Sequence, residues 1–325
     1  MKIIITGGAG FIGSHLSEYL LKKGHSIIII DNLSTGRLEN IKNFKKKIKF
    51  VKADISKKGT WQKFFKDVHT VFHLAALADI VPSIQNPSKY FDSNVTGTKN
   101  IVENSIKYKV KKIIYSASSS CYGIPKKYPT SENSKMNPQY PYALTKMIGE
   151  QILIHYGKLF GIKILSLRLF NVYGTKSRTS GTYGAMFGVF LKQKIKNYPL
   201  TVVGDGKQKR DFTYVSDVVR AFVKGLKYDC KTNILNIGTG KPVAVNKIVS
   251  LLKSNKIHIP KRPGEPDITC ANISLAKKEL NWNPTIKIEK GVNLLLKNLD
   301  YWEKAPLWTK QKIKIATKDW FKFLK

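Results

Sequence analysis

The 325-residue sequence has few cysteines, and none is spaced like a member of a structural or redox motif. Cys121, Cys230 and Cys270 are odd in number and form no Cys-x-x-Cys pair. This pattern argues against a disulfide framework and against a zinc site. We therefore expect that the protein binds no metal and is located in the reducing cytoplasm.

Long apolar runs are also missing. The longest purely aliphatic stretches, such as residues 27–30, stop far short of the ~20 residues that a transmembrane helix needs. The first residues, MKIIITGGAG, reach glycine too soon for the apolar core of a secretory signal. Low-complexity segments and fixed-period repeats are absent as well. We expect a soluble, unprocessed chain with no membrane partner, folded throughout as one large or two packed domains.

Negative charge is scarce. The sequence has 21 acidic residues against 57 basic ones, for a formal net charge of +36. Such an excess can indicate nucleic-acid binding. However, only six of the basic residues are arginine, the residue that suits phosphate forks and base edges, and the lysines are dispersed. We expect no nucleic-acid partner, and a positive field that speeds the arrival of an anionic substrate.

The first 170 residues alternate short β-branched runs with longer amphipathic segments. Residues 11–24 place apolar side chains at helical spacing and end at Gly24. Strict alternation of strand and helix favours right-handed crossovers, so we predict an α/β fold with a doubly wound parallel sheet. The predicted strands are KIIIT, SIIIID, IKFVKAD, TVFHLAA, KKIIYSAS and IKILSLRL.

After Asn171 the alternation loosens and Pro- and Gly-containing loops become more frequent. We predict a doubly wound domain in residues 1–170 and a smaller α+β domain in residues 171–325, parts of which return to pack on the first. The ligand of such a sheet binds at the strand ends, here in the cleft between the two domains.

The C-terminal segment predicts an amphipathic helix. Thr309 is the expected N-cap, and an apolar face follows at helical spacing. We expect this helix to pack on its own domain rather than to bind a partner. The predicted face consists of Ile313, Ala316, Trp320, Phe323 and Leu324.

The segment TGGAGFIG, residues 6–13, follows the first strand and opens the first helix. It fits two dinucleotide-binding glycine patterns. Glycines let a pyrophosphate approach the helix N-terminus, whose amides and dipole favour negative charge. Asp31 ends the second strand, where a carboxylate binds a ribose diol and repels a 2′-phosphate. The pattern predicts NAD rather than NADP. Arg37 lies nearby in the sequence, so NADP stays an alternative cofactor at this point.

The segment YALTK places Tyr142 and Lys146 four residues apart, on one face of a helix whose start Pro138 and Pro141 set. A phenol has a pKa near ~10 and is a poor base at neutral pH unless a cation stabilises the phenolate. A tyrosine–lysine pair behind a dinucleotide motif and a serine-rich strand end is therefore a candidate catalytic pair.

Eight segments together resemble an extended short-chain dehydrogenase/reductase that acts on nucleotide sugars, of the UDP-glucose 4-epimerase type. They are TGGAGFIG, DNLSTG, HLAA, SASSSCYG, YALTK, LRLFNVYG, RDFTYVSD and KRPGEPD. The resemblance runs from Met1 to about Trp302 and implies a Rossmann domain that binds NAD. It also implies a C-terminal domain that binds a UDP-sugar, and a homodimer formed by the helices that hold Asn94 and Tyr142.

The resemblance assigns Ser118, Tyr142 and Lys146 to catalysis. Ser118 would hydrogen-bond the 4-hydroxyl of the sugar and Tyr142 would take its proton, while Lys146 would hold the nicotinamide ribose and keep Tyr142 ionised. The implied NAD contacts lie along successive strand ends and in the catalytic helix: Gly7, Gly10, Phe11, Ile12, Gly13, Asp31, Asn32, Asp54, Ile55, Ala75, Ala76, Asn94, Tyr142 and Lys146.

Residues after Ser118 distinguish reactions within the family. Related 4,6-dehydratases carry Asp-Glu in the next two positions, and decarboxylases place a glutamate at the second of them. This chain has Ser119 and Ser120 there. A 3,5-epimerase needs a cysteine two residues before the tyrosine of the YG pair, whereas Cys121 directly precedes it. The resemblance therefore implies a 4-epimerase.

The remaining positions that match the family concern the UDP-sugar. Thr269 is small where some 4-epimerases place a tyrosine, which implies room for an N-acetylated sugar and a hydroxyl to bond it. Arg178, in the divergent loop from Thr175 to Met186, is placed to meet an acidic sugar. The full implied substrate set is Ser118, Ser120, Asn171, Arg210, Arg262, Glu265 and Thr269.

Other readings stay open at this point. The chain can be a dehydratase, decarboxylase or uronate epimerase of the same family, or a non-catalytic NAD-binding regulator, because fold does not fix function. The presence of Ser118, Tyr142 and Lys146 together argues against the regulator, which has no use for them.

Overall fold

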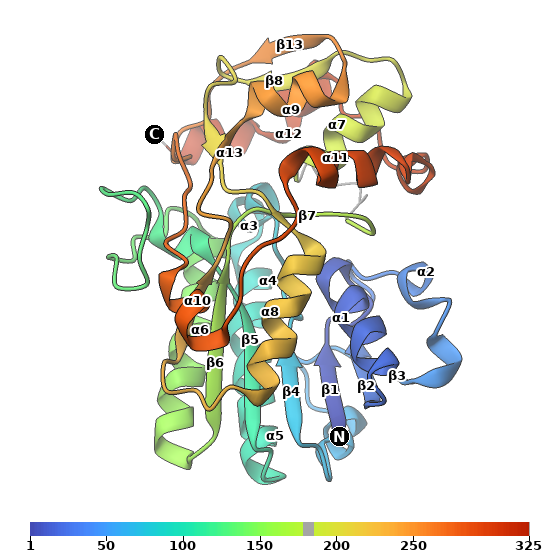
Figure 1. The fold of residues 1–325 in the computed structure, drawn as a ribbon, viewed down its shortest axis with the longest axis vertical. Coiled ribbons are helices and arrows are strands. Elements are labelled where there is room, and N and C mark those ends of the chain that lie inside the picture. The colour runs from blue at the N-terminus through green and yellow to red at the C-terminus, as the bar shows by residue number, and fades with distance from the viewer. Residues whose placement is uncertain (178–184, 325) are drawn as a thin grey trace.

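The computed structural model describes residues 1–177 and 185–324, and within them one large sheet dominates (Figure 1). Its strands are β1 (Lys2–Thr6), β2 (Ser26–Asp31), β3 (Lys49–Lys52), β4 (Thr70–His73), β5 (Lys112–Ser118), β6 (Lys163–Leu169) and β11 (Ile234–Ile237). The spatial order is β11-β6-β5-β4-β1-β2-β3, and every neighbouring pair is parallel. This confirms the predicted doubly wound parallel sheet.

Helices cover both faces of this sheet, and the strand sequences show why. In β1, Ile3 and Ile5 pack in one apolar core, whereas Ile4 packs in the other. Side chains alternate across a strand, so a strand buried on both faces has to be apolar throughout. Helices α1 (Phe11–Lys22) and α8 (Val215–Lys227) close the first core, and α5 (Gly97–Lys107) and α6 (Pro141–Phe160) close the second.

The other helical segments are short and lie mainly in the loops between strands and in the smaller layer described below. The α-helices are α2 (Leu38–Ile41), α3 (Ile80–Gln85), α4 (Pro87–Phe91), α7 (Met186–Ile195), α9 (Val245–Leu252), α10 (Ser274–Leu280), α11 (Ile288–Leu296), α12 (Lys310–Ala316) and α13 (Lys318–Phe323). Short 3-10 helices are η1 (Lys45–Lys47), η2 (Thr60–Phe65), η4 (Ser119–Tyr122) and η5 (Leu299–Trp302), and η3 (Asp92–Thr96) is a π-helical turn.

A smaller layer covers the carboxyl ends of the parallel strands, at the top of Figure 1. Three strand pairs build it: β7 (Val172–Tyr173) with β10 (Thr213–Tyr214), β8 (Leu200–Val203) with β13 (Lys256–Ile259), and β9 (Lys209–Arg210) with β12 (Val243–Ala244). Helices α7, α9 and α11 accompany them, which gives the predicted α+β composition. Between these segments the chain returns to the sheet as α8 and β11.

The C-terminal segment differs from its prediction. Thr309 is the N-cap, because its hydroxyl accepts a hydrogen bond from the backbone N–H of Lys312 at 3.3 Å. The chain then forms two helices, α12 and α13, instead of one, and the helical period does not carry across the break at Thr317. Trp320 is therefore buried, while Phe323 is 60% exposed, so its predicted place on the apolar face was wrong.

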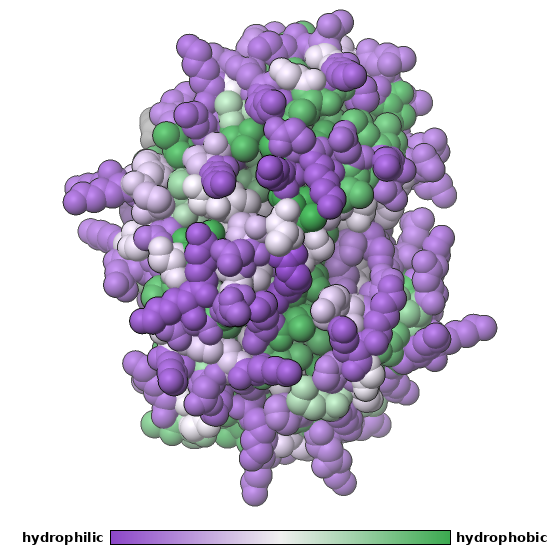
Figure 2. All heavy atoms as spheres, viewed as in Figure 1, coloured by the Kyte–Doolittle hydropathy of each residue, from purple (hydrophilic) through white to green (hydrophobic). Residues whose placement is uncertain are grey.

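The surface is mostly hydrophilic on the face seen in Figure 2, with hydrophobic residues between the polar ones rather than in one block. Within residues 1–177 and 185–324, no helix combines the length and the apolar character needed to cross a membrane.

Candidate active site

A cavity of about 650 Å³ lies where the smaller layer meets the carboxyl ends of the strands. This volume is typical of a ligand pocket. Within residues 1–177 and 185–324, its walls include every predicted site residue except Asn94. They consist of the glycine loop, the ends of β2, β3, β4 and β5, the start of α6 and the segments of the smaller layer that carry Arg210 and Arg262. The structure thus brings together side chains from across the sequence.

The glycine loop is tightly folded and leaves no space for side chains. A Cβ on Gly7, whose φ is +69°, would lie 2.7 Å from the backbone nitrogen of Ala75. A Cβ on Gly13 would lie 2.2 Å from the carbonyl oxygen of Gly7. Helix α1 begins after Gly10 without a side-chain cap, and its first turn lines the cavity. Uncapped amides in a side-chain-free cradle fit the pyrophosphate of a dinucleotide.

Asp31 lies next to this cradle, at the end of β2. Its buried carboxylate accepts hydrogen bonds from the backbone N–H groups of Ala9 at 3.0 Å and Leu33 at 2.8 Å. Burial raises the pKa of Asp31, and the two hydrogen bonds oppose that rise. A carboxylate has about four lone-pair sites, so Asp31 can still accept bonds from a ribose diol.

Ser118 ends strand β5 and faces Tyr142 of α6. Its hydroxyl lies 2.8 Å from that of Ser120 and accepts the backbone N–H of Ser120 at 3.2 Å, so the serine run is both a capped turn and part of the cavity wall. Tyr142 follows Pro141, the first residue of α6, as predicted. Burial raises the pKa of Tyr142, and a hydrogen bond with Ser118 lowers it in part.

Lys146 lies one helical turn after Tyr142 and is almost completely buried. Its ammonium is 4.0 Å from the ring centre of Tyr115, a cation–π contact. Burial lowers the pKa of Lys146 to about 7, against the opposing charge of Glu150. The side chain is therefore poised between its charged and neutral forms near neutral pH.

A buried polar chain behind the cavity was missed by the sequence reasoning. His73 Nδ1 lies 2.7 Å from Thr6 Oγ1, and its Nε2 lies 2.9 Å from Thr98 Oγ1. The motif HLAA contains His73, but nothing in the motif shows which groups surround the ring. Asn94, which does not line the cavity, bonds Leu77 and Thr145 and so joins the loop after β4 to α6.

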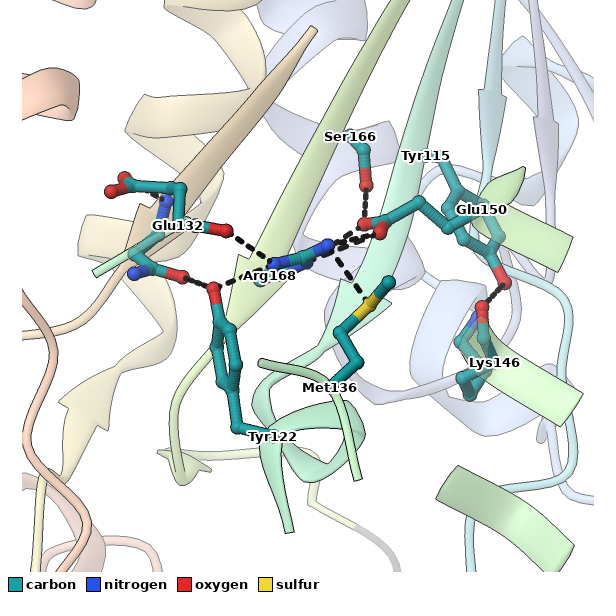
Figure 3. A network of polar contacts seen from close by, with 9 residues as sticks. Tyr115, Tyr122, Glu132, Met136, Lys146, Glu150, Ser166 and Arg168 are labelled. Carbon is teal, nitrogen blue, oxygen red and sulfur yellow. Dashed lines mark hydrogen bonds and ion pairs between the residues drawn. The ribbon is translucent and has the colours of Figure 1, made fainter. Parts of the chain in front are cut away.

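Figure 3 shows a second buried network, which fixes α6 relative to the serine turn. The guanidinium of Arg168 forms a buried ion pair with Glu150 of α6 and donates to the Tyr122 hydroxyl at 2.8 Å. Ser166 donates to the same carboxylate at 2.6 Å. Because Tyr122 ends the turn that starts at Ser118, this network holds the catalytic candidates of β5 and α6 in place.

The substrate side of the cavity carries two arginines and one carboxylate. Glu265 lies 3.1 Å from the Nη1 of Arg262 and 3.5 Å from the Nη2 of Arg210. The three side chains are at most 20% exposed and carry a net positive charge, which suits an anionic ligand.

Thr269 and Asn171 face each other at the same wall. The hydroxyl of Thr269 donates to Asn171 Oδ1 at 2.7 Å and accepts the backbone N–H of Asp211 at 3.0 Å. This hydroxyl therefore donates to one protein partner and accepts from another, and its second lone pair is left to accept a hydrogen bond from a ligand. Arg178 lies outside the described residues.

The polar groups of the described chain do not suggest a metal centre. Among residues 1–177 and 185–324, no three His, Cys, Asp or Glu side chains lie close enough together to hold an ion.

Comparison with known proteins agrees with this geometry. A Methanocaldococcus jannaschii protein, named provisionally as a UDP-glucose 4-epimerase, is 39% identical over 297 residues, which cover 89% of this chain and 95% of that protein. The UDP-glucuronic acid 4-epimerase of Bacillus cereus, solved with UDP-glucuronic acid and NAD, has 33% identity and a TM-score of 0.84, covering 94% of this chain and 99% of its own.

A third relative is the UDP-N-acetylglucosamine 4-epimerase of Methanobrevibacter ruminantium, solved with UDP-N-acetylmuramic acid. It has 30% identity and a TM-score of 0.85, and the alignment covers 91% of this chain and 98% of its own. Residues 3–238 match the sequence model of the NAD-dependent epimerase/dehydratase family. With its Rossmann sheet, glycine cradle and cavity in agreement, the chain belongs to the NAD-dependent epimerase/dehydratase family.

Proposed function

We propose that this enzyme inverts the configuration at C4 of a UDP-hexose. One observation carries the proposal: Ser118, Tyr142 and Lys146 converge on one cavity, and that cavity also holds the dinucleotide cradle and the two arginines. The cavity thus has one end suited to a cofactor and another suited to a sugar diphosphate, with a candidate base between them.

In the proposed reaction, Tyr142 takes the proton of the 4-hydroxyl while Ser118 holds that hydroxyl by a hydrogen bond. NAD, which the glycine loop and Asp31 would hold, would supply the acceptance of hydride from C4 and its return to the same carbon. We expect the charged form of Lys146, one helical turn from Tyr142, to favour the phenolate during the reaction. The 4-keto sugar then presents its other face, and Tyr142 returns the proton to the oxygen.

The positions next to Ser118 support epimerisation over the related reactions. Ser119 and Ser120 line the cavity, and neither can act as the acid or base that water elimination or decarboxylation needs. Cys121 is buried, and burial raises the pKa of its thiol to about 12. Cys121 is also not among the described residues that line the cavity, so its thiol does not reach the proposed position of the sugar.

For the sugar we propose UDP-glucose and UDP-N-acetylglucosamine. Thr269 lies at the cavity wall and is smaller than tyrosine, which leaves space for a 2-acetamido group. Its hydroxyl is bonded to Asn171 and Asp211, and its second lone pair can accept a hydrogen bond from the acetamido N–H.

Product analysis tests the proposal. Purified enzyme is incubated separately with UDP-glucose, UDP-N-acetylglucosamine and UDP-glucuronate, and products are identified by NMR. We expect an equilibrium mixture of C4 epimers from the first two sugars. A 4-keto-6-deoxy product, a pentose, or no conversion of any of the three sugars would contradict the proposed reaction.

A further inference from the structure

The last helix of the chain reaches the cavity that holds the catalytic candidates. Trp320, in α13, is 2% exposed and lines this cavity together with Arg262 and Tyr140. Its indole Nε1–H donates to the carbonyl oxygen of Pro263 at 2.8 Å. Trp320 is thus anchored to the loop that carries Arg262.

The indole ring also contacts the side chain of Arg262 itself. The guanidinium carbon of Arg262 lies 5.2 Å from the ring centre of Trp320, and Glu265 binds the Nη1 of the same guanidinium at 3.1 Å. Tyr140 packs beside the indole with ring centres 6.4 Å apart. The guanidinium therefore has an aromatic face as well as a carboxylate to set its orientation.

The tail that carries Trp320 spans the two layers of the molecule. At its start, the carbonyl oxygen of Trp308 accepts a hydrogen bond at 2.7 Å from Gln193 of α7, in the smaller layer. At its end, Asp319 accepts one at 3.0 Å from Gln85 of α3, whose first residues line the cavity. The tail therefore bridges the smaller layer and α3, and Trp320 meets the cavity beside Arg262.

We propose that Trp320 is a positioning residue of the substrate site, which orients the guanidinium of Arg262 toward the diphosphate of the nucleotide sugar. The proposal rests on the proposed function, in which Arg262 contacts the diphosphate. It makes α13 part of the substrate pocket rather than only a helix packed on its own domain.

The physical reason is preorganisation. An arginine side chain has many rotamers, and a bidentate contact with phosphate requires one of them. An aromatic face and a carboxylate that hold the guanidinium before the substrate arrives reduce the entropy lost on binding. The benefit appears in the binding of substrate and transition state alike, so KM changes and kcat does not.

Three substitutions at this position separate the roles of the ring. Trp320→Phe keeps an aromatic face, while Trp320→Leu keeps apolar bulk but no ring. Trp320→Ala removes both. Phe323→Ala, on the same helix but 60% exposed, is the matched control. Each variant is measured for kcat and KM with the UDP-sugar that the wild type converts, for the Kd of UDP by calorimetry, and for Tm.

We expect Trp320→Leu and Trp320→Ala to raise KM and the Kd of UDP about tenfold with kcat within about twofold. Trp320→Phe restores most of the affinity, and Phe323→Ala changes nothing. If Trp320→Leu binds UDP as the wild type does, or if the phenylalanine variant is as weak as the leucine variant, the positioning role is wrong. Retention of NAD on purification shows that the variants are folded.

Arg262→Ala distinguishes a failure of this inference from a failure of the proposed function. If Arg262→Ala leaves UDP binding unchanged, the assignment of Arg262 to the diphosphate fails. If it weakens binding but Trp320→Leu does not, only the inference about Trp320 fails. The double variant combines Arg262→Ala with Trp320→Leu. We expect it to bind UDP no more than about twofold more weakly than Arg262→Ala alone, because the indole ring acts through the arginine. Additive losses would overturn the inference.

Discussion

At the scale of the residue, burial changes the acid–base chemistry of the groups around the cavity. The pKa of Tyr142 rises, that of Lys146 falls to about 7, and that of His73 falls to about 3. In each case the charged form loses hydration in the protein interior. Tyr142 therefore needs a neighbouring positive charge to act as a base, and His73 stays neutral as a member of a hydrogen-bonded chain.

Removing the Tyr142 hydroxyl tests its role as the base. We expect Tyr142→Phe to lower kcat by at least ~100-fold, the typical contribution of a positioned acid–base group. NAD still copurifies, because the glycine cradle and Asp31 are unchanged. Steady-state rates and the absorbance of released cofactor measure both properties. Near-normal turnover in the variant would show that another group takes the proton.

His73 predicts a pH dependence of stability. Its pKa is about 3 in the folded chain against an ordinary value of 6.5, so the unfolded chain binds more protons between these two pH values. Stability from this group is complete above pH 6.5 and is lost toward pH 3, by about 1.4 kcal/mol per pH unit for one proton. The free energy of unfolding in urea is measured at several pH values. We expect His73→Gln to remove this part of its slope against pH. Equal slopes in both proteins would contradict the assignment.

We propose that Thr269, at the cavity wall, limits the size of the sugar that fits. We expect Thr269→Tyr to lower kcat/KM for UDP-N-acetylglucosamine at least ~10-fold while UDP-glucose is affected little, since a ring fills the space of the acetamido group. Thr269→Val is the control, because it keeps the volume and loses the hydroxyl. Equal losses on both sugars in the tyrosine variant would refute the size argument.

At the scale of the element, the active site depends on the packing of α6 against β5 and β6. Helix α6 carries Tyr142 and Lys146 near its start and Glu150 one turn later. The buried pair of Glu150 with Arg168 joins the helix to the sheet, and Arg168 also holds Tyr122 at the end of the serine turn. The distance between Ser118 and Tyr142 thus follows from contacts outside the cavity.

Breaking this pair leaves a buried charge without its partner. We expect Glu150→Gln to lower the free energy of unfolding by about 3–5 kcal/mol. Glu103→Gln is the control, because Glu103 pairs with Lys99 on the exposed side of α5 and we expect a loss below about 1 kcal/mol. The free energies of unfolding of both variants are measured by urea denaturation and compared with that of the wild type. Losses of similar size would mean that the buried pair has no special role.

At the scale of the whole molecule, the net charge of +36 and the anionic substrate act on each other over a distance. The lysines are dispersed along the sequence, while Arg210 and Arg262 line the cavity. A positively charged protein attracts a diphosphate before contact, and salt screens that attraction.

The expected homodimer and the expected cytoplasmic location of the protein remain predictions.

Salt dependence tests the role of this field. We expect kcat/KM for the UDP-sugar to fall several-fold between ~20 mM and ~300 mM NaCl, where the Debye length shortens from about 20 Å to about 6 Å, while kcat changes little. Sucrose at matched osmolality is the control. A kcat/KM that does not respond to salt would show that long-range attraction plays no part in substrate capture.

The sequence by itself determined the sheet and the cofactor class through local patterns, and its resemblance to the family supplied the catalytic candidates and the expected reaction. Continuous isoleucine runs predict strands buried on both faces, and the glycines at residues 7–13 predict a dinucleotide turn. Proline at position 141 predicted the start of α6, and residue identity at positions 118–121 narrowed the reaction.

Only the tertiary structure decided which residues from distant segments meet. Trp320 lies beside Arg262 and Tyr140, His73 lies between Thr6 and Thr98, and the hydroxyl of Thr269 is bonded to Asn171. A periodic pattern specifies which face of an element is apolar, but not which element covers it. The break between α12 and α13 likewise followed from packing against two layers, whose positions no local pattern contains.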